Sequence, residues 1–110
     1  MKVIDPEVAG ALASELPPEV FATIVQTFEA DVARLLQELV AASRTGDTVA
    51  WHRGAHSLAG AAGGVGATQL EALAREAMRP DHLPSATVAL RLGEAAKAAL
   101  EELGQLAAAG

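Results

Sequence analysis

Histidines are the residues with the clearest chemical potential in this sequence, and two of them share one segment. His52 and His56 lie four residues apart, and His82 follows in a loop between two prolines. A neutral imidazole is a nucleophile near pH 7, and two imidazoles four residues apart on a helix can also bind a divalent metal. The spacing alone therefore leaves two kinds of site open, a nucleophilic site at His56 and a metal site that includes His52.

The metal site lacks the further ligands that it would need. Zinc takes three or four ligands in proteins, and the chain has no cysteine. Asp47 precedes His52 by more than one helical turn, and Glu71 belongs to the next predicted helix. The glycines after His56 do not form the GxxxxGK[ST] pattern of a phosphate-binding loop, so we expect neither nucleotide binding nor kinase activity.

The residues that follow His56 have small side chains or none. The stretch AHSLAGAAGG contains Gly60, Gly63 and Gly64, although each glycine inside a helix costs about 1 kcal/mol relative to alanine. At about 100° per residue, His56 lies about 140° from the centre of the apolar stripe and should face solvent. We hypothesise that the bare backbone lets another protein approach the imidazole closely. The alternative is that His56 is an ordinary surface residue in an alanine-rich helix.

Apolar residues at helical spacing predict five helical segments. A short one follows Asp5, the second ends at Gly46, the third begins at Asp47 or Thr48, and the fifth begins near Ser85. Thr68 and Glu71 have the spacing of a capping box for the fourth. The buried stripes are expected at Phe21, Val25, Phe28, Val32, Leu35, Leu39 and Ala42, and at Trp51, Ala55, Leu58, Ala62 and Val65. We predict one all-α domain over residues 1–110, an antiparallel up-down four-helix bundle with a short additional N-terminal helix.

Composition argues against several classes of partner. The 110 residues carry a formal charge of −6, and the eight lysines and arginines form no cluster, so we do not expect nucleic-acid binding. No stretch approaches the ~20 apolar residues of a membrane span, and the first residues do not form a signal peptide. We therefore expect a cytoplasmic protein that does not contact membranes. The apolar stripe of the second helix is wide enough for a dimer, but a monomeric bundle can bury it, and we expect a monomer.

A longer pattern around His56 resembles a known family. Ala55-His56-Ser57-Leu58-x-Gly60, followed by Gly66-Ala67-x-x-Leu70, is similar to the signature of histidine-containing phosphotransfer (HPt) domains. The likeness is specific from about Phe28 to Met78, and elsewhere it rests on the order of the helices. It implies that His56 accepts a phosphoryl group from the aspartate of one receiver domain and donates it to another. Gly60 would be the small residue that lets the receiver dock.

The same resemblance implies the partners and the cofactor. They would be response-regulator receiver domains and a sensor or hybrid histidine kinase. Mg²⁺ would be bound by the receiver, so that this chain has no cofactor of its own and no kinase activity. The resulting partner-binding surface comprises His52, Arg53, Ala59, Gly60, Gly63 and Gly64.

One position departs from the family pattern. The family usually has a lysine three residues after the histidine, and here that residue is Ala59. Either Arg53, or His52 when protonated, supplies the missing positive charge, or the domain is impaired in transfer and serves as a docking module for receivers or other proteins. An ordinary solvated surface cation is the alternative interpretation of Arg53.

Overall fold

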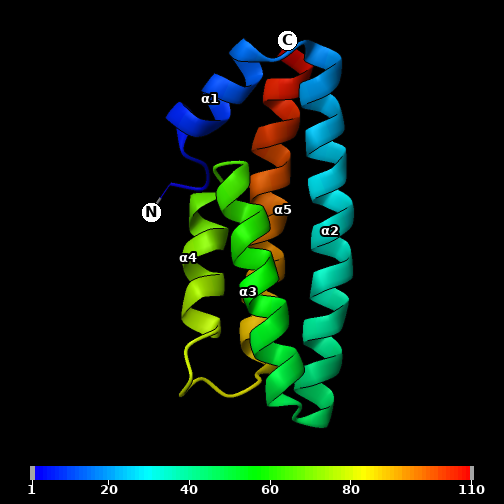
Figure 1. The fold of residues 1–110 in the computed structure, drawn as a ribbon, viewed down its shortest axis with the longest axis vertical. Coiled ribbons are helices and arrows are strands. Elements are labelled where there is room, and N and C mark those ends of the chain that lie inside the picture. Colours follow the sequence, from blue (N-terminus) through cyan, green and yellow to red (C-terminus); the bar gives the residue numbers. More distant parts are fainter. Residues whose placement is uncertain (1, 110) are drawn as a thin grey trace.

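The computed structural model describes residues 2–109, and each regular element in that range is an α-helix. The helices are α1 (Pro6–Glu15), α2 (Pro18–Thr45), α3 (Thr48–Gly64), α4 (Thr68–Ala77) and α5 (Ala86–Ala109). Figure 1 shows α2 to α5 running along the long axis of the molecule, with the chain direction reversing from each helix to the next. The short α1 packs against α2 and α5. The predicted all-α class is confirmed.

Most helix ends lie where the sequence predicted them. The Asp5 and Asp47 carboxylates accept hydrogen bonds from the backbone N–H groups of Glu7 and Ala50, at 2.9 and 3.0 Å. Ser85 accepts one from the N–H of Val88. These side chains satisfy donors that have no partner within their helices. Gly46 ends α2 with a φ of 71°, in the left-handed region that glycine adopts without strain.

The predicted capping box at the start of α4 is wrong. Ala67 is the N-cap residue, and its side chain makes no capping hydrogen bond. Thr68 is already the first helical residue, so its hydroxyl donates back to the carbonyl of Gly66 instead. Glu71 is therefore not engaged at the helix start, and its carboxylate is free to interact elsewhere.

The core lies along the facing sides of the long helices, and it fixes the position of α3. The predicted stripe of α2 is buried except for the partly exposed Val25, and Trp51 and Leu58 of α3 are fully buried. At Gly54, an added Cβ would lie 3.1 Å from Leu39 of α2. The two helices approach closely there because glycine has no side chain. The opposite face of α3, which carries His56, is consequently directed away from the core.

Candidate functional site

His56 lies in the middle of α3 and is exposed to solvent. Its neighbours Ala55 and Leu58 are fully buried, which anchors the helix on both sides of the histidine. The predicted exposure of the imidazole is therefore confirmed. The ring projects from a helix that is held by its core contacts, as a reactive group needs if a partner is to approach it in a fixed orientation.

The glycines after His56 do not share one environment. Gly60 and Gly64 are exposed, and a Cβ added at either would have no atom within 4 Å. At Gly63, an added Cβ would lie 2.9 Å from Oε2 of Glu71. Gly60 and Gly64 are thus open backbone. The prediction that Gly63 belongs to the same bare surface is wrong, because the Glu71 side chain of α4 lies against it.

Ala59 also differs from the prediction. It is 2% exposed and belongs to the core, so it offers no surface to a partner. Ala59 and Gly63 are four residues apart and face the same side of α3. This is the side against which α4 packs, as the Glu71 contact shows. Its spacing of three residues does place Ala59 on the same side of α3 as His56, but this spacing contains no information about the neighbouring helix.

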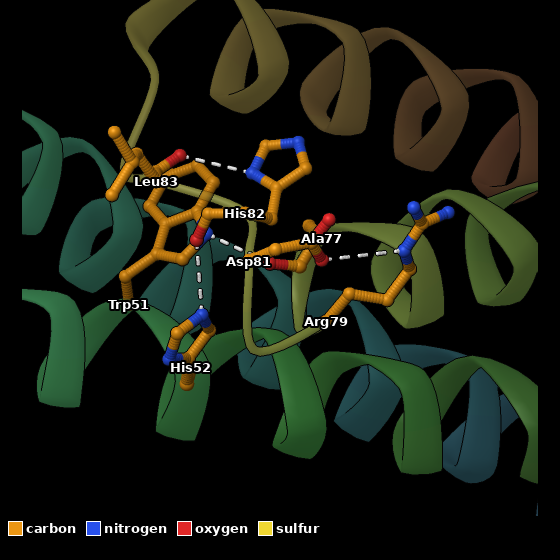
Figure 2. Close-up of polar contacts among 7 residues, drawn as sticks. All are labelled: Trp51, His52, Ala77, Arg79, Asp81, His82 and Leu83. Atoms are coloured by element: carbon orange, nitrogen blue, oxygen red, sulfur yellow. Dashed lines mark hydrogen bonds and ion pairs between the residues drawn. The ribbon is translucent and has the colours of Figure 1, made fainter.

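His52 contacts the loop between α4 and α5, as Figure 2 shows. Its Nε2 lies 3.0 Å from the carbonyl oxygen of His82. Because a carbonyl only accepts, Nε2 is the protonated ring nitrogen of His52 in this arrangement. The His82 ring stacks on the indole of Trp51, and its Nδ1 lies 2.9 Å from the carbonyl oxygen of Leu83. His52 therefore helps to hold this loop, in addition to any contact it makes with a partner.

Two arginines lie on different sides of α3. Arg53 is exposed and lines a hollow together with residues of α2 that include Glu38 and Thr45. Arg75 of α4 forms an ion pair of 2.8 Å with Glu71. Arg75 was not predicted as a site residue from the sequence, because it belongs to a different helix from His56. The sequence does contain one indication of its ion pair, because Arg75 follows Glu71 by four residues and this spacing favours a pair on one helix face.

Other binding features do not coincide with His56. A hollow of about 580 Å³ lies between α2 and α5, where Val40 and Leu90 are among the residues that line it. Across residues 2–109, no three histidine, aspartate or glutamate side chains gather in a way that could hold a metal ion. The site at His56 is therefore an exposed helix surface, which is accessible to the surface of another protein.

The family model of the Hpt domain matches residues 23–109, which extend from the second turn of α2 to the end of α5. The chain belongs to the Hpt domain family. Hpt domains are phosphotransfer modules of His-Asp phosphorelays, and they interact with histidine kinases and receiver domains. The Hpt match contains all of α3 and α4 and leaves α1 outside.

The remaining comparisons add no closer relative. No curated protein and no solved structure matches this chain. In the part of the chain that the structure describes, no helix combines the length and apolar character that a membrane crossing requires.

Proposed function

We propose that this Hpt domain is a histidine phosphocarrier that accepts and donates a phosphoryl group at His56. The observation that carries the proposal is the exposed imidazole on the middle of α3, followed by open backbone at Gly60 and Gly64. Helices α2 to α5 would form an antiparallel up-down four-helix bundle, with α1 as an addition, in a single domain. The partners would be the receiver domains of response regulators and a sensor or hybrid histidine kinase.

The transfer step needs little covalent chemistry from the chain. The lone pair of the unprotonated ring nitrogen of His56 forms an N–P bond with the aspartyl phosphate of a receiver. The O–P bond breaks, and its electron pair leaves on the aspartate carboxylate. Phosphoryl transfer depends mainly on in-line positioning and on neutralisation of charge. The Mg²⁺ of the receiver would supply part of that charge, so the chain acts as a carrier and not as an enzyme with a cofactor of its own.

The docking surface would be centred on His56 and the exposed residues near it. Gly60 and Gly64 allow close approach, and Arg53 and His52 lie one turn before the histidine. A monomer suffices for this role, because one exposed helix face carries every group of the proposed surface.

A second candidate function follows from the residue at position 59. Ala59 is buried and uncharged, so it contributes nothing to a phosphoryl group on His56. A chain that transfers poorly for this reason would still present the same surface to receivers. The alternative is therefore a docking module that binds receivers or other proteins without carrying a phosphoryl group.

Incubation of the wild-type chain with a phosphorylated receiver distinguishes the two candidates. A carrier acquires about one phosphoryl group per chain, in the acid-labile and base-stable form typical of phosphohistidine, and returns it when fresh receiver is added. A docking module binds the receiver but remains unlabelled. Binding without label would contradict the carrier proposal.

Replacing Gly60 by glutamine tests the close-approach surface. Since there is open space around Gly60, the variant should fold and be about 0.5 kcal/mol more stable, because glutamine is the better helix former. Transfer from the receiver should nevertheless slow by about tenfold, because the side chain obstructs docking. Labelling by the small donor phosphoramidate should remain within about twofold, because a small donor needs no docking surface.

Gly104→Gln is the matched control for this experiment. Gly104 is also an exposed glycine of a helix with open space around it, but it lies near the end of α5. This variant should be stabilised similarly and should accept the phosphoryl group at the wild-type rate. Equal transfer rates for the two variants would mean that Gly60 has no role in docking.

A further inference from the structure

Arg75 of α4 lies beside the face of α3 that carries His56. Its Nε and Nη2 donate hydrogen bonds to Oε2 of Glu71, at 3.1 and 2.8 Å. The same oxygen lies 2.9 Å from the position that a Cβ of Gly63 would occupy. The Glu71 carboxylate therefore holds the guanidinium group at the edge of α4 that faces α3.

Helices α3 and α4 run in opposite directions (Figure 1). From the Glu71–Gly63 contact and the helical rise, the backbone of Arg75 lies between the levels of Gly63 and His56. Glu71 is level with Gly63, and His56 lies seven residues before Gly63, about 10.5 Å along the helix axis. Arg75 follows Glu71 by four residues, so its backbone is about 6 Å along the same path. Its long side chain can turn from Glu71 toward His56 from this position.

The charges favour an exchange of partners. A phosphoryl group carries up to about two negative charges and three acceptor oxygens, and a guanidinium binds such a group through two parallel hydrogen bonds. The Arg75 side chain is 59% exposed and that of Glu71 is 29% exposed. An ion pair this exposed contributes little stability, so Glu71 is a weak competitor for the guanidinium.

Arg53 is the other cation near His56, but its surroundings direct it elsewhere. It lines a hollow with Glu38, Asp47 and other residues on the α2 side of α3. Arg75 is instead held on the α4 side of α3 by its hydrogen bond to Glu71. Ala59 of α3, at the same level along the helices, is a buried and uncharged residue.

We propose that Arg75 pairs with the phosphoryl group on His56 and exchanges the Glu71 carboxylate for the phosphoryl oxygens during transfer. This inference rests on the proposed function of His56. The bonds that form and break are those of the transfer step above. Arg75 keeps its protons and contributes hydrogen bonds and positive charge to the oxygens of the transferring group.

The test compares transfer rates from a phosphorylated receiver and from phosphoramidate for Arg75→Gln, Arg75→Lys, Glu71→Gln and Arg53→Gln. Circular dichroism establishes that each variant is folded. Arg75→Gln should slow transfer from both donors by about tenfold, within the range for loss of one charged hydrogen-bond donor at a partly solvated site. Arg75→Lys should restore most of the rate. Glu71→Gln should match or exceed the wild-type rate. Arg53→Gln should leave labelling by phosphoramidate within about twofold of the wild-type rate and slow only transfer from the receiver, because Arg53 belongs to the docking surface and lies on the α2 side of α3.

Glu71→Gln separates a chemical role of Arg75 from a structural one. If Arg75 only stabilised α4 through the ion pair, Arg75→Gln and Glu71→Gln would slow transfer equally. Equal slowing would therefore overturn the inference. Labelling of Arg75→Gln at the wild-type rate would overturn it as well. Absence of label on the wild-type chain would instead overturn the proposed function, and the inference with it.

Discussion

Replacing His56 by glutamine should reduce acid-labile labelling by a phosphorylated receiver to background. Glutamine is polar and of similar size, but its amide nitrogen has no nucleophilic lone pair. Because His56 is exposed, the free energy of unfolding should change by less than about 0.5 kcal/mol. The His56→Gln chain should therefore remain folded and still bind the receiver. Label is measured after a single turnover and compared with the far-ultraviolet circular dichroism of the same samples.

His52→Gln is the matched control for the loss of label. A glutamine at this position retains an N–H group that can donate to the carbonyl of His82, so the loop should stay in place. Because His52 also belongs to the proposed docking surface, the comparison uses phosphoramidate as the donor, and this variant should be labelled by it to the wild-type extent. Wild-type labelling of His56→Gln, or loss of label in His52→Gln alone, would show that the carrier is a different residue.

Replacing Trp51 by alanine should destabilise the domain by about 3–5 kcal/mol, the range for removing a buried tryptophan. Trp51 is fully buried, and its Nε1 donates to the carbonyl of Ala77 at 2.9 Å. That carbonyl lies in the last turn of α4, where carbonyls have no partner within the helix. The indole also stacks on His82, with ring centroids 6.2 Å apart. Its loss would therefore affect the core, the end of α4 and the following loop together.

Urea denaturation followed by circular dichroism measures this loss. The free energy of unfolding of Trp51→Phe should lie between those of the wild type and Trp51→Ala. Phenylalanine keeps most of the apolar volume but leaves the Ala77 carbonyl without its hydrogen-bond donor, at a cost of about 1–3 kcal/mol. Leu90→Ala is the control, since Leu90 is 65% exposed and should change the free energy of unfolding by less than about 0.5 kcal/mol. A loss below about 1 kcal/mol for Trp51→Ala would contradict the described contacts.

The sequence was sufficient to predict features that depend on one helix at a time. The period of apolar residues identified Trp51 as a core residue and placed His56 on the exposed side of its helix. Local backbone chemistry identified Gly46 as the end of α2 and limited the cap of α3 to Asp47 or Thr48, of which the structure has Asp47. These signals are local because the hydrogen bonds and dihedral angles that produce them lie within a few residues.

Features that depend on the packing of two helices could not be predicted in this way. Helical spacing in α3 places Ala59 and Gly63 on the same side as His56, but it does not show that α4 covers these two residues. The interaction of Glu71 with Gly63 requires the register between α3 and α4, which a single sequence does not reveal. The proposed role of Arg75 depends on the same register, and for this reason only Arg53 and His52 could be considered from the sequence as sources of charge.

The most direct test of the central claim is nuclear magnetic resonance of the wild-type chain after transfer from a phosphorylated receiver. The phosphorus signal should correlate with the imidazole ring protons of His56, and no other residue should carry phosphorus. Correlation with His52, His82 or a non-histidine side chain would contradict the assignment of His56 as the phosphoryl carrier.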